Sequence, residues 1–171
     1  LLMNNTHRIF IGLNLSGHLM DVFPMIRSTI YDKKQLINWI SGKNLHLTLS
    51  FIGDIDAEKI ENLKEQLNSI STFDSFDMSI SGTGIFPSEK TPKILWLDIE
   101  KGRQKLIDIQ KNIEKTAISF KSDIKNEEYI PHITIGRVKN VNENINFDLS
   151  TFFNAVYSSI SIPVKTIYLF K

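Results

Sequence analysis

Two short segments of the sequence, NLHLTLSFIG from Asn44 to Gly53 and PHITIGRV from Pro131 to Val138, share the order histidine, aliphatic, threonine, aliphatic. Both segments are dominated by apolar residues in a pattern that is typical of β-strands. In a strand, residues i and i+2 point to the same face and lie about 6.5–7 Å apart along the chain. The histidine and the threonine of each segment are therefore expected on one face, with the aliphatic residues packed on the other.

This arrangement suits the chemistry of phosphate esters. If the two strands face each other, His46 and His132 come together with Thr48 and Thr134 beside them. One imidazole can accept a proton from the nucleophile, the other can donate a proton to the leaving oxygen, and the hydroxyls can bind non-bridging oxygens. Histidine suits both roles because its ordinary pKa is about 6.5. Arg137, three residues after Thr134, could supply positive charge to the phosphate.

Two other interpretations compete with this one. A single strand histidine beside a threonine is more often a partly buried structural residue, but the repetition of the motif favours a shared function. A zinc site needs at least three protein ligands, and neither motif has a histidine or a carboxylate two residues after its own histidine. The sequence therefore predicts no metal site. His7 and His18 have no partner motif and are expected on the surface.

The rest of the chain divides into helical and strand patterns. Helices are predicted at residues 18–30 with an interruption at Pro24, from a cap at Asp56 to about Ile70, and at about 102–120. Strands are predicted at residues 8–15, 36–40, 44–53, 76–86, 93–100, 131–138 and 159–170, with a polar hairpin loop at 87–92. An Asn-rich polar stretch runs from Asn140 to Asn146. No linker divides the chain, so residues 1–171 are predicted to form one α+β domain of two closely packed lobes.

The composition limits the functions that the chain can have. Lys and Arg number 20 and Asp and Glu 19, for a net charge of +1, so any contact with nucleic acid must be local. The chain has no cysteine, which excludes disulfides and thiolate chemistry. No apolar run approaches the roughly 18–20 residues needed to span a bilayer, and no signal-peptide pattern is present. We therefore expect a cytoplasmic protein with no membrane partner.

The paired motifs resemble the signature of the 2H phosphoesterase superfamily. The segments RIFIGLNLS and GIFPSEKTPKILWL are similar to its branch of RNA 2′,3′-cyclic phosphodiesterases, also called 2′-5′ RNA ligases. The resemblance implies an α+β fold of two pseudo-symmetric lobes, each an antiparallel sheet with helices on its outer face, around a central cleft. It implies hydrolysis of a terminal 2′,3′-cyclic phosphate on RNA to a 2′-phosphate, with no metal and no cofactor. Some members also join tRNA half-molecules through a reversible, ATP-independent 2′-5′ linkage.

The same resemblance implies a role for each residue of the motifs. It makes His46 the proton donor and His132 the proton acceptor. Thr48 and Thr134 take the positions that bind phosphate. Arg137 matches an arginine that often follows the second motif in the family.

Phe10 and the end of the chain are interpreted from the same comparison, and the two tryptophans from the strand patterns. Phe10 matches an aromatic residue on the family's first strand, where it would either stack on a base or belong to the core. Trp39 and Trp96 lie within apolar strand patterns and are assigned to the core. The family continues past a strand like YLFK with one more strand, so this chain, which ends at Lys171, is expected to lack it.

The substrate stays open at this point. Candidate partners are RNA ends, including tRNA fragments, and nucleoside 2′,3′-cyclic phosphates, whereas other superfamily members act on other nucleotide cyclic phosphates or on 2′-5′ oligonucleotides. A non-catalytic module that binds phosphorylated RNA ends is the alternative from another class. An enzyme is favoured because a binder has no need for two titratable bases, and Lys or Arg would hold phosphate better. A monomer is expected.

Overall fold

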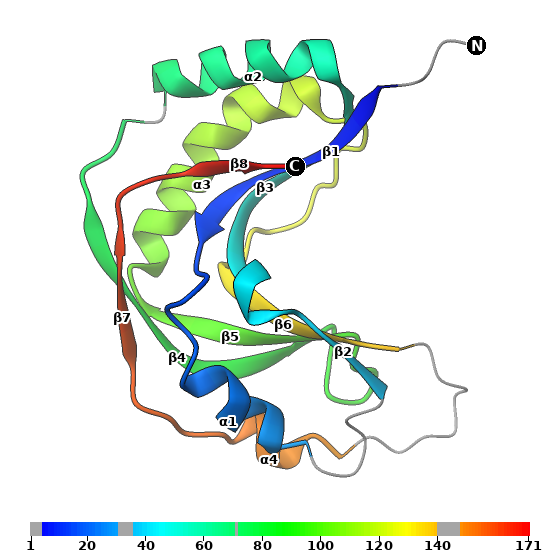
Figure 1. Cartoon of the computed structure of the whole chain (residues 1–171), viewed down its shortest axis with the longest axis vertical. Helices are drawn as coiled ribbons and strands as arrows, with labels where there is room; N and C mark the ends of the chain where they lie inside the picture. Colours follow the sequence, from blue (N-terminus) through cyan, green and yellow to red (C-terminus); the bar gives the residue numbers. More distant parts are fainter. Residues whose placement is uncertain (1–4, 31–35, 71, 140–147) are drawn as a thin grey trace.

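The strands form two antiparallel sheets in a computed structural model that describes residues 5–30, 36–70, 72–139 and 148–171 (Figure 1). Within these residues, the first sheet has the order β3-β1-β8, with bounds His46–Asp56, Thr6–Asn14 and Tyr168–Phe170. The second sheet has the order β2-β6-β5-β4-β7, with bounds Ile37–Trp39, His132–Val138, Ile94–Lys101, Phe76–Phe86 and Ile160–Val164. The α+β fold class of two lobes is confirmed.

Helices pack against both sheets. The helical elements are α1 (Val22–Ser28), η2 (Gly42–Asn44), α2 (Ala57–Ile70), α3 (Arg103–Ala117), η3 (Ile118–Phe120) and α4 (Ser150–Phe153). Helices α2 and α3 pack against each other and against β3 of the first sheet, while α1 and α4 lie beside the second sheet (Figure 1). The predicted helices that end near Ile70 and Phe120 are thus confirmed. The first predicted helix is shorter than expected, because residues 16–21 form turns and α1 begins two residues before Pro24.

Alternating burial sets the orientation of the two strands that carry the histidine motifs. Leu47 and Leu49 are buried in β3, and Ile133 and Ile135 are buried in β6. Burying a side chain of this size stabilises the fold by about 1.5–3 kcal/mol. A slip of one residue in either strand would expose these side chains and bury the polar ones, so the apolar residues determine where the polar residues point. Strands β3 and β6 contact each other between the two sheets (Figure 1).

The last part of the chain differs from its prediction. One strand was expected over residues 159–170, but the structure has two, β7 and β8, which belong to different sheets. Pro163 has no N–H to donate, and β7 accordingly lies at the edge of the second sheet, where β4 is its only partner among the described strands. After Val164 the chain crosses to the first sheet, where β8 pairs with β1.

Each sheet takes strands from both halves of the chain. The predicted strands at 36–40 and 44–53 both exist, but β2 pairs with β6 in the second sheet and β3 pairs with β1 in the first. Together with β8, which brings the end of the chain back to β1, this exchange joins the two lobes at two places. The Asn-rich stretch from Asn140 to Asn146 lies outside the described residues.

Candidate active site

Each histidine motif begins its strand. His46 is the first residue of β3 and His132 is the first residue of β6. Each histidine and the threonine two residues later are half-buried, whereas the aliphatic residue between them is fully buried. Thr48 and Thr134 therefore share a face with their histidines, as the alternation predicts.

Both motif strands contain a β-bulge at the same place. The pairing of β1 with β3 skips Leu49, and the pairing of β5 with β6 skips Ile135, which is the equivalent residue of the second motif. A bulge adds one residue to a strand and reverses the alternation beyond it. Arg137, five residues after its histidine, is therefore exposed on the histidine's side instead of the opposite one. The equivalent residue of the first motif is Phe51, which is also exposed.

The two imidazoles are held by the same kind of hydrogen bond. His46 Nδ1 lies 2.7 Å from the carbonyl oxygen of Asn44, and His132 Nδ1 lies 2.6 Å from the carbonyl oxygen of Ile130. A carbonyl oxygen only accepts, so Nδ1 carries the proton and donates it in both rings. This leaves Nε2 of each neutral ring as a proton acceptor for a substrate. The bonds involve backbone atoms two residues before each histidine, and the sequence pattern carried no signal for them.

Aromatic side chains pack around His46 in the first sheet. The ring centroid of Phe10 lies 4.6 Å from that of His46, and the centroid of Phe170 lies 5.8 Å from it. Phe10 and Phe170 stack on each other, with centroids 4.6 Å apart and planes inclined by 7°. Phe10 thus lies beside the first motif as the family comparison implies, and Phe170 was not predicted.

A second aromatic group surrounds His132 and corrects one expectation. The rings of Phe86 and Trp96 lie 5.0 and 5.8 Å from that of His132. Trp96 was assigned to the core, but it is half-buried on the histidine's side, directly opposite Thr134 in the strand pairing. Gly84 makes room for its indole, because a Cβ there would lie 2.1 Å from the ring. Trp39 does pack against the core as expected.

The charges around His132 have opposing effects on its pKa. Burial lowers the pKa of His132 and is the largest cause, and the positive charges of Arg137 and His46 lower it further. The hydrogen bond to the Ile130 carbonyl and the negative charge of Asp98 oppose these effects. Because the net direction is downward, His132 is neutral at pH 7 and is suited to accept a proton.

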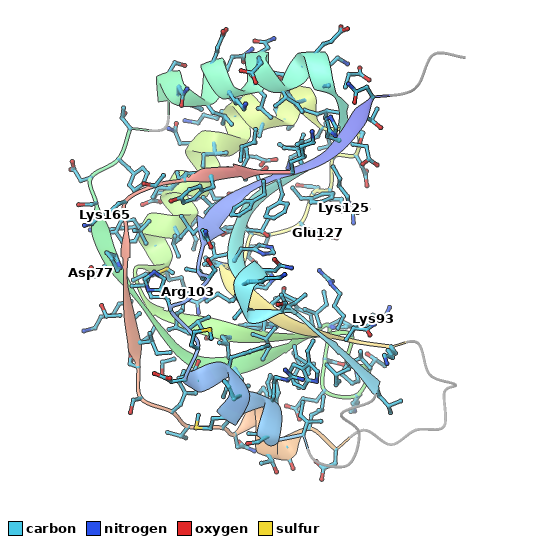
Figure 2. The ribbon with its side chains drawn as sticks, viewed as in Figure 1. Asp77, Lys93, Arg103, Lys125, Glu127 and Lys165 are labelled. Atoms are coloured by element: carbon cyan, nitrogen blue, oxygen red, sulfur yellow. The ribbon has the colours of Figure 1, made fainter. Side chains whose placement is uncertain are left out.

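Asp98 is itself paired with a cation. It lies opposite His132 in the pairing of β5 with β6. Arg103 lies at the start of α3 (Figure 2). Its guanidinium donates to the Asp98 carboxylate and, at 2.9 Å, to the carbonyl of Ile99. Both side chains of this pair are about one-third exposed, so its contribution to stability is modest, about 0–1 kcal/mol. Its effect on the site is to offset part of the negative charge near His132.

The other two histidines lie outside the two motifs, and the described residues contain no group of metal ligands. His18 is exposed and His7 is half-buried, and their positions in the chain are outside both motifs. Within residues 5–30, 36–70, 72–139 and 148–171, no three side chains of His, Cys, Asp or Glu are grouped so that they could hold a metal ion. None of the helices in these ranges is long and apolar enough to cross a membrane.

In each lobe a bulged strand presents a histidine and a threonine, which is the pattern expected of the two-histidine phosphoesterases. A model of the LigT-like phosphoesterase family matches residues 26–96. An RNA 2′,3′-cyclic phosphodiesterase of Aquifex aeolicus is 33% identical in an alignment of 137 positions that covers 77% of this chain and 71% of the relative. The chain belongs to the LigT-like phosphoesterase family.

Further relatives agree over nearly the whole chain. An RNA 2′,3′-cyclic phosphodiesterase of Thermotoga maritima is 28% identical in an alignment of 172 positions, gaps included, that covers 94% of this chain and 91% of the relative. The crystal structure of E. coli LigT complexed with 3′-AMP superimposes with a TM-score of 0.74 at 20% identity, over 96% of this chain and 87% of that one. At this identity the superposition supports the fold.

Proposed function

We propose that this protein hydrolyses the 2′,3′-cyclic phosphate at the end of an RNA strand to a 2′-phosphate, without a metal ion. The observation that carries the proposal is the matched pair of imidazoles, each with Nδ1 bonded to a backbone carbonyl and Nε2 left for a substrate. The relatives of Thermotoga maritima and Aquifex aeolicus that share the family carry the name of this activity.

In the proposed reaction the two histidines act on opposite sides of the phosphorus. His132 Nε2 takes a proton from water as the water oxygen bonds to phosphorus. The bond from phosphorus to the 3′-oxygen breaks, and His46, protonated at Nε2 before the reaction, gives that proton to the departing oxygen. The products are a 3′-hydroxyl and a 2′-phosphate. The lowered pKa of His132 supports its assignment as the base.

The remaining site residues would bind the substrate. Thr48 and Thr134 would donate hydrogen bonds to non-bridging oxygens, and Arg137 would stabilise the charge that develops on them. Phe10, which stacks on Phe170 and also packs against His46, would offer the exposed part of its ring to the nucleoside. In the same site a 5′-hydroxyl in place of water would give a 2′-5′ linkage, and we propose this reversible ligation, without ATP, as a second activity.

A direct test uses a nucleoside 2′,3′-cyclic phosphate and a short RNA that ends in one. We expect both to be hydrolysed in the presence of EDTA, and the product to carry its phosphate on the 2′-oxygen, as mapped by phosphorus NMR. The reason is that the two motifs supply a base, an acid and phosphate donors without a cation. Loss of turnover in EDTA with recovery in zinc or manganese would contradict the proposal, and tight binding without turnover would favour a binding module.

The pH dependence of kcat/KM should report His132. As the base it works in its neutral form, so activity falls as the pH drops through its pKa. Because burial, Arg137 and His46 lower this pKa, we expect the midpoint of the acidic limb below 6.5, the ordinary value for histidine. Measuring kcat/KM on the nucleoside 2′,3′-cyclic phosphate from pH 4.5 to 8 would locate it, with pH-stability checked at each point. A midpoint at or above that ordinary value would argue against His132 as the base.

A further inference from the structure

The carbonyl that holds His46 is fixed by its own segment of chain. Asn44 is the last residue of η2, and its N–H donates to the carbonyl of Ser41 at 2.8 Å. The next residue continues this turn, since the Leu45 N–H reaches the Gly42 carbonyl. The direction of the Asn44 carbonyl is therefore set by local hydrogen bonds within a helical turn.

The Ile130 carbonyl, which accepts the hydrogen bond from His132, lies in a segment without regular secondary structure. Positions 121–131, all within the described residues, form no helix or strand. Figure 2 shows Lys125 and Glu127 on this segment, and both are exposed. Ile130 is also exposed, although its carbonyl oxygen accepts the proton of His132 Nδ1. Something other than a helical turn must orient this carbonyl.

Tyr129 supplies a contact that can do so. Its hydroxyl donates to the carbonyl oxygen of Thr48 at 2.9 Å, in the middle of the first histidine motif. Burial raises the pKa of Tyr129, so the phenol remains a donor across the working pH range. The next residue, Ile130, precedes Pro131 and is restricted by it to an extended conformation. One anchored side chain and one restricted residue thus leave the Ile130 carbonyl little freedom.

We propose that Tyr129 is a positioning residue that ties the segment before β6 to the backbone of β3 and so aims the Ile130 carbonyl at Nδ1 of His132. The hydrogen bond joins the segment just before the second motif to the first motif. It therefore also sets the position of His132, the proposed base, relative to β3, the strand that carries the proposed acid His46. The kinetic part rests on the proposed function, whereas the geometric part concerns the ring of His132 alone.

Tyr157 is a matched control for Tyr129. It is also a half-buried tyrosine whose hydroxyl donates to a backbone carbonyl, that of Gly82, at 2.7 Å. Burial raises its pKa as well, and the negative charge of Asp98 raises it further, so the phenol is neutral and Tyr157→Phe leaves the charge near Asp98 unchanged. Its bond runs from the segment before β7 to β4, and it does not connect the two motif strands. Tyr157→Phe therefore measures the general cost of losing such a hydroxyl.

The first measurement is kinetic. In Tyr129→Phe we expect kcat on a nucleoside 2′,3′-cyclic phosphate to fall about 10- to 100-fold, because small misplacements of a catalytic group cost this much, with KM little changed. Tyr157→Phe should lower the melting temperature by a similar amount and leave kcat nearly intact. Equal kcat values for Tyr129→Phe and wild type, measured well below both melting temperatures, would overturn the proposal.

The second measurement does not require turnover. The ring ¹⁵N chemical shifts of His132 distinguish protonation at Nδ1 from protonation at Nε2. We expect the Nδ1–H form in the wild type, a mixture of both forms in Tyr129→Phe, and unchanged shifts for His46. If the wild type hydrolyses no cyclic phosphate but the His132 shifts still change in Tyr129→Phe, the proposed function is refuted and the positioning role of Tyr129 is retained. Unchanged His132 shifts, or a Tyr129→Phe variant that fails to fold while Tyr157→Phe folds, would reduce Tyr129 to a structural contact.

Discussion

Replacing either His46 or His132 by alanine should reduce kcat/KM on an RNA 2′,3′-cyclic phosphate on the order of 10²- to 10⁴-fold, since general acid and base groups typically contribute this much each. The 3′-oxygen is a poor leaving group without a proton, and water is a poor nucleophile unless it loses one. Both variants should retain the fold, because each imidazole is only half-buried and lies at the start of its strand. Initial rates with a cyclic-phosphate-ended oligonucleotide, together with circular dichroism, would measure both effects.

His18→Ala is the matched control for these two variants. His18 is an exposed histidine that follows β1, and its replacement should leave kcat/KM essentially unchanged. If the alanine variants at positions 46 and 132 behaved like this control, the two-histidine site would be wrong. If only one of them lost activity, the protein would use a single histidine, and the symmetry of the motifs would have a structural origin.

Much of the fold could be predicted from the spacing of apolar residues. Helix α3 buries Leu106, Ile113 and Ala117 on one face, which is the periodicity of about 3.6 visible in the sequence. The motif strands bury every second residue up to their bulges, so the shared face of each histidine and threonine followed from the period of two. These features are local, and local patterns are what a sequence displays most directly.

The features that were predicted wrongly depend on contacts between elements that are distant in the sequence. The pattern over residues 159–170 is continuously β-like, and only the competition between two sheets divides it into β7 and β8. Trp96 lies in an apolar string, yet it packs on the histidine's side because Gly84 on the neighbouring strand leaves room for the indole. The bulge before Arg137 depends on the pairing with β5, so strict alternation would have put this residue on the wrong face.

The residues of the candidate site could be named from the sequence, but the groups that orient them could not. The side chains of the two motifs are visible in the sequence, whereas the Asn44 and Ile130 carbonyls that orient the imidazoles are backbone groups. The hydroxyl of Tyr129 reaches a carbonyl 81 positions earlier in the chain, and no sequence spacing indicates such a contact. The roles of acid and base stay a prediction, because both imidazoles have the same hydrogen-bonded geometry.

A substrate with sulfur in place of the 3′-oxygen should separate these roles. A thiolate leaves without being protonated, so this substrate needs a base for water but no acid for the leaving group. His46→Ala should therefore recover most of its lost rate relative to wild type, a gain on the order of the 10²- to 10⁴-fold that the acid contributes. His132→Ala still lacks the base and should remain impaired. The measurement is the ratio of kcat/KM on the sulfur and oxygen substrates for each variant and for wild type.

The asymmetry around the two histidines gives the expected direction of this result. The partial burial of His132 and the nearby positive charge of Arg137 lower its pKa and favour the neutral form that a base requires. In the strand pairing His132 faces Asp98, whereas His46 faces the uncharged Asn14, so the two environments differ although the motifs match. Rescue of His132→Ala instead of His46→Ala would reverse the assignment and assign the base to the first motif. Rescue of neither would mean that both imidazoles act mainly by holding the phosphate, because a group that only binds loses the same interaction with either leaving atom.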